Sequence, residues 1–429
     1  MNMLLRRPVT RKLILRVRRH PRIHLAVRKI YFFIRRSTKI GSAQQLYPNP
    51  GPWQIKRNQN RNLVTIVTRD IPMYDRAGSY LRLHEIILLL QILNFKVRIL
   101  SLNTIDRQRS LWELEMEDIY EYQNIYRNLN VEVLTGGIQS LNICQSNVAE
   151  QHIFWLHEVG VAFDFLDHFR GKIPFQKIFL DTVDLEYRRH FQMGAVRMAD
   201  ESVKKLVALS KYADKTILIT NEEKTLHSQL VRNENVKNYV LSNIYEEFRP
   251  VSQPKSVDSK YELLFVGNFL HLPNIDALDF LLDSIISELD GIRIGVVGPN
   301  LPIDYVNKIN SYKERDVSYL GQVRDISSIY QVSKVVIAPL RVGAGVKGKV
   351  LEALQHGKTV VGTSIAWEGI PDLNASVKYE ANSGPEFASA IKLALSNDSV
   401  LNEQDCQLLN SVFSRKKNLE NLMEIMDVQ

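Results

Sequence analysis

Short apolar runs alternate with longer helical patterns from residue 63 onwards, and this alternation constrains the fold more than any other feature of the 429-residue chain. Three of the runs, Leu63–Val67, Lys96–Leu102 and Lys177–Leu180, have the length and aliphatic content of buried strands. Strands separated by helices predict a mainly parallel sheet that is wrapped by helices. The expected fold class is therefore α/β.

The alternation stops once and then restarts. Residues 249–260 are polar and contain two prolines, and buried-strand patterns resume at Glu262–Val266. We therefore expect two doubly wound, Rossmann-like domains at residues 62–250 and 258–400, with the helical segment 401–429 packing back on the first domain. Two such domains facing each other leave a cleft at the carboxyl ends of both sheets, where ligands bind.

The charge is distributed unevenly along the chain. Residues 1–61 contain 16 of the 55 Lys and Arg residues and no Asp or Glu, so the remaining residues carry 39 basic against 47 acidic groups. Ile23, Val27, Ile30 and Ile34 recur at helical spacing within this basic arm. The expected arrangement is a basic amphipathic helical arm with a linker, followed by an acidic body.

The arm favours contact with an anionic membrane surface through residues 1–40, because a basic helix with an apolar stripe suits such a surface. Its longest apolar run, Ile30 to Ile34, is too short for a membrane span or a signal peptide. A solvated basic tail is the open alternative. Nucleic-acid binding is the weaker one, since no recognisable motif accompanies the charge.

Cysteine usage points to a reduced compartment. Cys144 and Cys406 lie far apart and form no disulfide framework. Together with the arm, this predicts a cytoplasmic protein that is peripheral on the inner face of the cell membrane.

The most informative motif begins at Pro339 and reads P-L-R-x-G-A-G-x-K-x-K-x-x-E. It follows a predicted strand and opens a predicted helix, so Gly343 and Gly345 let the backbone approach a ligand closely. The helix N-terminus favours an anion, and Arg341 and Lys347 add two cations, which suits a diphosphate. Glu352, one turn further on, could accept hydrogen bonds from the diol of a ribose. A structural glycine turn with surface cations is the alternative.

This motif resembles the donor-binding signature of retaining GT-B glycosyltransferases of group 1, a family 4-like class. Three further segments resemble parts of the same family: Leu264–Ala277, Asp75–Arg82 and Phe179–Tyr187. The resemblance covers residues 62–400 and is strongest from 262 to 370. It implies two Rossmann-like domains facing a cleft, a nucleotide-sugar co-substrate and no cofactor.

The resemblance also implies roles for individual residues. Glu352 takes the place of the glutamate that binds the nucleotide ribose, whereas the first glutamate of the family's pattern falls on Ala344. Asp184 retains the acidic half of a His-Asp pair at the acceptor side, with Val183 in the place of the histidine. The implied catalytic and phosphate-contacting residues are Asp184, Lys347 and Arg341; the implied donor-binding residues are Gly78, Ser79, Gly267, Asn268, His271, Gly343, Ala344, Gly345, Val346 and Glu352.

Two of these residues keep a structural alternative. His271 is either a phosphate or sugar contact or a satisfied loop histidine. Asp184 either orients the acceptor hydroxyl or caps the following helix.

The expected function is transfer of a sugar from a nucleotide-diphosphate sugar to a glycan or lipid-linked acceptor with retention, as in polysaccharide biosynthesis. No metal site is expected, because the chain has no D-x-D sequence and no His pair with convincing ligand spacing. A nucleotide-sugar epimerase and a non-catalytic glycan-binding relative are the alternatives. The second is motivated by Ala344 and Val183, where the family carries Glu and His.

Overall fold

The structure of the protein is a computed structural model. It describes residues 63–136, 152–169, 177–232, 236–250, 259–312, 316–323, 326–374, 377–397 and 400–428. The predicted basic arm and Cys144 lie outside the described residues. Cys406 is buried and makes no disulfide.

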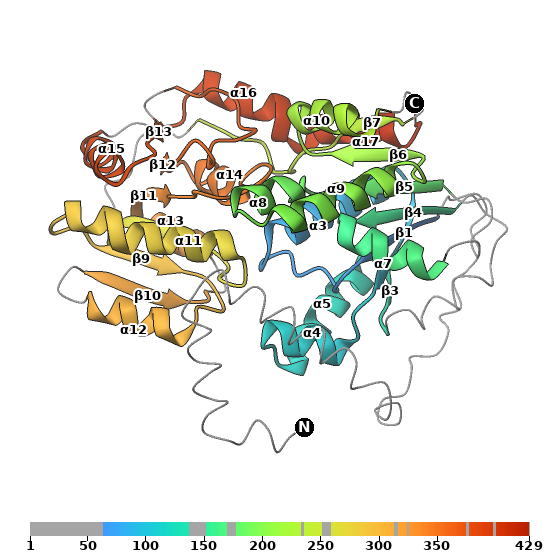
Figure 1. The fold of residues 1–429 in the computed structure, drawn as a ribbon, viewed down its shortest axis with the longest axis horizontal. Coiled ribbons are helices and arrows are strands. Elements are labelled where there is room, and N and C mark those ends of the chain that lie inside the picture. The colour runs from blue at the N-terminus through green and yellow to red at the C-terminus, as the bar shows by residue number, and fades with distance from the viewer. Residues whose placement is uncertain are drawn as a thin grey trace, which may run out of the picture. The chain divides into compact units, whose positions relative to one another are not determined.

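The first lobe is built on a seven-stranded sheet in the order β3-β2-β1-β4-β5-β6-β7, in which every neighbouring pair is parallel (Figure 1). The predicted strands are present with ends that differ by one or two residues. Their bounds are β1 Leu63–Thr68, β2 Lys96–Ser101, β3 Glu132–Leu134, β4 His152–His157, β5 Lys177–Asp181, β6 Lys215–Leu218 and β7 Asn238–Val240.

Helices cover both faces of this sheet. Consecutive residues of β1 point to opposite faces and are nevertheless buried on both. Ile66 belongs to the core that α3 covers, whereas Val67 belongs to the core that α7 covers. The helices are α3 Gly78–Ile92, α4 Ile105–Trp112, α5 Met116–Asn128, α7 Val159–Phe169, α8 Glu186–Gln192, α9 Val196–Ser210 and α10 Asn221–Val231. Strands that are covered on both faces are rich in apolar residues, as β1 is.

The second lobe has a six-stranded parallel sheet in the order β10-β9-β8-β11-β12-β13. Its strands are β8 Tyr261–Val266, β9 Ile294–Val297, β10 Val317–Gly321, β11 Ser333–Ala338, β12 Thr359–Gly362 and β13 Lys378–Glu380. Its helices are α11 Leu272–Phe280, α12 Ile303–Ser311, α13 Ile326–Gln331, α14 Gly348–Gln355 and α15 Gly384–Ser396. The sequence did not predict β13, an edge strand of three residues.

The C-terminal segment forms two helices that join different cores. Helix α16, Glu403–Phe413, contributes Leu409 and Phe413 to the core of the second lobe. Helix α17, Arg415–Ile425, contributes Leu422 and Ile425 to the core of the first lobe. A bridge between Tyr245 and Ser414 marks the crossing.

Two helix boundaries differ from the sequence prediction. Serine is a preferred N-cap residue, so the sequence predicts Ser79 as the cap of α3; instead, the carbonyl of Ala77 accepts the first helical N–H groups, from Tyr80 and Leu81. Ala77 is therefore the N-cap, and Ser79 lies inside the first turn, where its hydroxyl cannot cap. The apolar pattern of residues 274–289 predicts a single helix there, whereas the helix begins at Leu272 and changes after Phe280 into a π turn and a 3₁₀ turn.

Among the described residues, no helix is both long enough and apolar enough to cross a membrane.

Candidate functional site

The glycine turn between β11 and α14 lies directly against the first lobe. Gly345 has φ of +65°, in the left-handed region that favours glycine. A Cβ at Gly345 would lie 2.5 Å from Cδ1 of Ile219 and 3.3 Å from Cβ of Asp184. Both neighbours belong to loops at the carboxyl ends of the first sheet. The turn thus needs glycine for conformation and for space, and Gly345 lies close to Asp184.

The backbone of this turn is already hydrogen-bonded. The N–H of Gly343 donates to Oε1 of Gln192 at 2.8 Å, and the carbonyl of buried Val346 accepts from Asn243 at 3.4 Å. The sequence predicts that the N–H groups of this turn are available to an anion, whereas in the structure the N–H of Gly343 already donates to Gln192. Gln192 is exposed, and exchange of its neutral amide for a phosphate would replace an ordinary hydrogen bond by a charge-assisted one. Ala344 is half-buried and brings no carboxylate to the turn.

Lys347 is the N-cap of α14, and its side chain folds back over the turn. Its ammonium donates to the carbonyl of Gly345 and to Oε2 of Glu368, the latter at 3.3 Å. The side chain is 9% exposed. Burial lowers the pKa of Lys347, and the nearby carboxylate of Glu368 opposes that shift. Helix α14 has no side-chain cap and no acidic residue in its first turn, so its positive dipole end stays uncompensated.

Glu352 lies on α14 behind the turn. Its Oε2 accepts a hydrogen bond of 3.1 Å from the hydroxyl of Tyr330, which is fully buried and stacks on His356. Burial raises the pKa of Glu352, while Tyr330 and the positive charge of Lys349 counteract the shift. The carboxyl group is thus held by an aromatic partner, and its ribose role stays a prediction.

Arg341 has different partners from Lys347. Its guanidinium makes a two-pronged ion pair with Asp276 of α11, at 2.7 and 3.1 Å, and lies 5.0 Å from the centre of the Phe280 ring. The side chain is 46% exposed. The sequence grouped Arg341 with Lys347 at the diphosphate. In the structure their charged groups face separate carboxylates.

The loop after β8 carries three predicted donor residues. A Cβ at Gly267 would lie 2.9 Å from Cγ of Asn274, so glycine lets α11 pack closely. The amide of Asn268 donates to the carbonyl of Arg76 in the first lobe at 3.2 Å. His271 is the N-cap residue of α11, although its side chain makes no cap hydrogen bond.

The surroundings of His271 reveal a cluster of positive charge. His271 is exposed to solvent, but the protein atoms around its imidazole disfavour the charged form. This effect, together with the charges of Arg189, Lys349 and Lys347, lowers the pKa of His271 to about 3. Arg189 comes from the first lobe and the two lysines from the second. Cations from both lobes that converge on a neutral imidazole suit an anionic ligand.

Gly78 and Ser79 open α3. Gly78 is exposed, and a Cβ placed on it would meet no atom within 4 Å. The first turn of α3 contains no acidic residue and receives no side-chain cap. These features leave free helix N–H groups at this end, and the predicted contact with the donor remains a prediction.

Asp184 does not cap the following helix, because Leu185 is the N-cap residue of α8. Its Oδ2 instead accepts a 2.6 Å hydrogen bond from Arg189. The preceding Val183 has φ of +65°, an unusual value for a β-branched residue, and such strain is concentrated at functional sites. The pair with Arg189 orients the Asp184 carboxylate beside the Gly345 turn.

Sequence reasoning missed a buried network beneath Asp184. The carboxylate of Asp181 accepts from Arg82 at 2.7 Å, from Trp155 at 3.0 Å and from Nδ1 of His157 at 3.2 Å. Burial alone would raise the pKa of Asp181, but Arg82 and His157 outweigh it and lower the pKa. Only the acidic residue after an apolar strand could have hinted at this network.

Lys349 was also missed, although it lies in the motif itself. Its ammonium donates to Oδ1 of Asn274 at 2.6 Å and lies 5.3 Å from the centre of the Phe265 ring. Burial lowers the pKa of Lys349 to about 7, and Lys347 lowers it further. The described residues place no carboxylate within ion-pair distance of Lys349. The repeated K-x-K spacing was the available signal.

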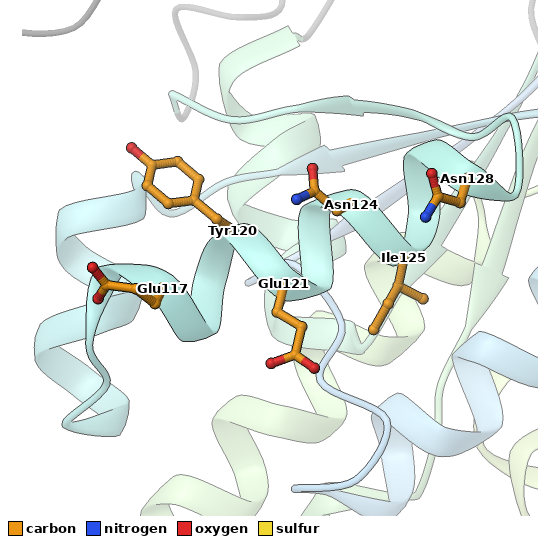
Figure 2. Close-up of a pocket in the computed structure, with 6 residues that line it drawn as sticks. All are labelled: Glu117, Tyr120, Glu121, Asn124, Ile125 and Asn128. Carbon is orange, nitrogen blue, oxygen red and sulfur yellow. The ribbon is translucent and has the colours of Figure 1, made fainter.

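The described residues offer no metal centre and no surface pocket that would be a better candidate for the functional site. Within the described residues, no three His, Cys, Asp or Glu side chains are grouped to hold a metal ion. A surface pocket of 450 Å³ is lined by side chains of α5 alone (Figure 2): Glu117, Tyr120, Glu121, Asn124, Ile125 and Asn128. None of them is a predicted site residue, so the candidate site rests on the loops between the sheets.

The two parallel-sheet lobes match the GT-B fold of solved glycosyltransferase structures. Residues 260–397 match the family described as glycosyl transferases group 1. These residues span the strand before the Gly267 loop, the glycine turn and Glu352. No curated protein sequence matches the chain.

Solved structures share the fold over most of the chain. Sucrose-phosphate synthase from Thermosynechococcus elongatus matches with a TM-score of 0.66 at 11% identity, covering 86% of this chain and 98% of its own. HepE from Anabaena, solved with UDP and glucose, matches with a TM-score of 0.63 at 12% identity, covering 85% and 99%. The lipopolysaccharide outer core galactosyltransferase WaaB matches with a TM-score of 0.53 at 10% identity, covering 85% and 99%.

Proposed function

We propose that the protein is a glycosyltransferase that moves a sugar from a nucleotide-diphosphate sugar to a glycan or lipid-linked acceptor, with retention and without a metal. The observation that carries the proposal is the cation cluster of Lys347, Lys349 and Arg189 beside the Gly345 turn. It lies in a chain whose residues 260–397 match group 1 glycosyltransferases. The UDP complex of HepE supports a nucleotide as the donor's leaving group.

In this proposal each group has a physical task. Lys347 and the N-terminus of α14 stabilise the charge that develops on the departing diphosphate. Glu352 accepts hydrogen bonds from the ribose, and Gly78 and Ser79 approach the phosphate from the first lobe. Asp184 is ion-paired with Arg189, so its task is to orient the acceptor hydroxyl.

The test has two stages. A panel of nucleotide sugars is first screened by thermal shift, because a ligand that binds only the folded state raises the melting temperature. The best donor is then titrated by calorimetry into wild type, Lys347→Ala and Glu352→Ala. We expect both variants to bind more weakly, whereas Lys334→Ala, an exposed lysine of β11, should match wild type. Unchanged affinity in both site variants would refute the site.

The chemistry needs a separate readout. An acceptor screen with the identified donor, followed by assignment of the new anomeric configuration, tests retention. Activity that persists in excess EDTA tests metal independence. Conversion of one nucleotide sugar to another without acceptor would instead support an epimerase.

We also propose that residues 1–40 hold the protein at an anionic membrane surface, supported by the charge and the apolar stripe of that segment. Full-length protein should bind vesicles that contain phosphatidylserine, less so at high salt. A variant without residues 1–40 should remain in solution. Equal partitioning of the two proteins would contradict this role.

A further inference from the structure

Glu368, which no motif above includes, lies where three loops of the two lobes meet. The next residue, Gly369, has φ of +75°, and a Cβ on it would lie 2.8 Å from Val346 and 2.9 Å from Thr220. Val346 belongs to the glycine turn, and Thr220 follows β6 of the first lobe. The segment after β12 is therefore wedged between the turn and the first lobe.

One carboxylate at this junction binds a cation from each lobe. Oε1 of Glu368 lies 2.5 Å from the guanidinium of Arg188 on α8, and Oε2 lies 3.3 Å from the ammonium of Lys347. The three side chains are mostly buried, at 13%, 22% and 9% exposed respectively. Buried charges of this kind interact strongly with their partners and are costly to leave unpaired.

We propose that Glu368 is a positioning residue of the donor site: it holds Lys347 as a charged ammonium at the glycine turn and, through Arg188, ties that turn to the first lobe. The proposal rests on the proposed function, because it assigns Lys347 to the diphosphate of the donor. It adds a residue that the donor motif does not contain and a reason for the two lobes to meet at this point.

The physical argument concerns the charge state of Lys347. Burial disfavours its ammonium, and Glu368 is the largest influence in the opposite direction. The other charged and titratable groups that act on Lys347 or respond to it are Asp184, Arg188, His271 and Lys349. Of these, only Asp184 is negative. Removal of the Glu368 charge should therefore lower the pKa of Lys347 further.

The consequence is a pH dependence of known sign. A lysine with a lowered pKa loses its proton as the pH rises, so a Glu368→Gln variant should bind a diphosphate progressively more weakly at alkaline pH. Acidification should restore the ammonium and the affinity. A purely structural role for Glu368 would weaken binding equally at every pH.

The experiment measures nucleoside diphosphate affinity by calorimetry at pH 6.5 and pH 9. The probe is whichever of UDP, GDP, ADP and dTDP binds wild type best. We expect Glu368→Gln to lose about tenfold or more at pH 9, as a shift of one pKa unit implies, and to approach wild type at pH 6.5. Glu222→Gln is the matched control, because Glu222 also pairs with Arg188 but not with Lys347; its affinity should not change.

Two further variants sharpen the result. Lys347→Arg in the Glu368→Gln background should reduce the alkaline loss to that of wild type, because a guanidinium stays protonated at pH 9. Arg188→Ala should weaken binding by the same factor at both pH values relative to wild type, since it removes the contact between the lobes but leaves Glu368 beside Lys347. If Glu368→Gln fails to fold, Glu368→Asp serves instead: it keeps the charge and should retain the wild-type pH profile.

The outcomes separate the two proposals. Wild type that binds no nucleoside diphosphate would overturn the proposed function and this inference together. Wild type that binds one, combined with a Glu368→Gln profile parallel to that of Glu222→Gln at both pH values, would overturn the inference alone. A Glu368→Asp variant with a new alkaline loss would also overturn it.

Discussion

The carboxyl ends of the two sheets hold different kinds of ionisable group. In the first lobe, Asp181 ends β5 and Glu223 lies in the first turn of α10; both carboxyl groups are buried, and Asp184 is half-buried. In the second lobe the corresponding loops bring glycine turns and the two lysines at positions 347 and 349. Two sheets of the same parallel architecture thus present chemically different edges to each other.

The difference lies in how the charges are compensated. Asp181 has an arginine, a tryptophan and a histidine as internal partners, so its charge is part of the framework. Among the described residues, the one hydrogen-bond partner of the Lys349 ammonium is the amide oxygen of Asn274, and a second cation lies close by. A compensated buried charge indicates a structural role, whereas an uncompensated one indicates a place for a ligand of opposite charge.

The largest expected effect concerns the buried network around Asp181 in the first lobe. Arg82→Ala removes the partner of Asp181 and of the Leu241 and Ser242 carbonyls. The uncompensated buried carboxylate should reduce the free energy of unfolding by about 3–5 kcal/mol, measured by urea denaturation at pH 7. Arg98→Ala is the control, since its pair with Glu132 is partly exposed and contributes about 1 kcal/mol or less. Similar losses in both variants would contradict a special role for Arg82.

The next effect contrasts two cations of the second lobe. Lys347→Ala removes a largely buried ammonium at the turn and should weaken donor binding about 10- to 100-fold, the size of a hydrogen bond to a charged group. Arg341→Ala should weaken it by only about two- or threefold, because an exposed arginine that is already paired with Asp276 acts through solvent. Calorimetry with the identified nucleotide sugar measures both. A larger loss in Arg341→Ala would restore the role that the motif implied.

The fold could largely be predicted from the sequence because buried parallel strands are continuous apolar runs. Even the neighbour of the glycine turn, β11 at Ser333–Ala338, follows from its aliphatic residues. The edge strand Lys378–Glu380 could not, since its three residues, Lys-Tyr-Glu, give no apolar run. The true cap of α3 was missed because Ala77 caps with its backbone, and residue type does not reveal that.

The site could be predicted only in part, for a related reason. A motif shows which residues share a turn but not where their side chains point. Arg341 and Lys347 are six positions apart, yet one pairs with Asp276 and the other with Glu368. Contacts between the lobes, such as that of Gln192 with Gly343, join residues 151 positions apart, and no single-sequence pattern encodes them.

A smaller expected effect concerns the protonation of Lys349 when the donor binds. The pKa of Lys349 is lowered to about 7, so at pH 7.5 part of the population is neutral. A bound diphosphate favours the ammonium, and donor binding should therefore take up a fraction of a proton, about half or more. Titration of a nucleotide sugar in two buffers of different ionisation enthalpy measures this uptake. Lys349→Arg should abolish it, and uptake that persists in that variant would point to another group.

The smallest expected effect concerns Glu223 of the first lobe, which has no cation at ion-pair distance within the part of the chain that the structure describes. Burial raises the pKa of Glu223 to about 7, and the charge of Asp184 adds to the shift. Above the unfolded value of 4.5 the unfolded chain ionises while the folded chain keeps its proton, so the group lowers stability increasingly up to about pH 7. Below that range the penalty disappears.

Glu223→Gln cannot ionise and should therefore be more stable than wild type at pH 8, by about 2–4 °C in melting temperature, and nearly equal to it at pH 4.5. Thermal unfolding at the two pH values measures the difference. Glu222→Gln, on the exposed neighbour, should show no such pH dependence. A Glu223→Gln variant that is less stable at pH 8 would mean that its backbone hydrogen bonds, to the N–H groups of Leu185 and Ile219, outweigh the burial of its charge. Glu223 would then belong with Asp181 as part of the framework.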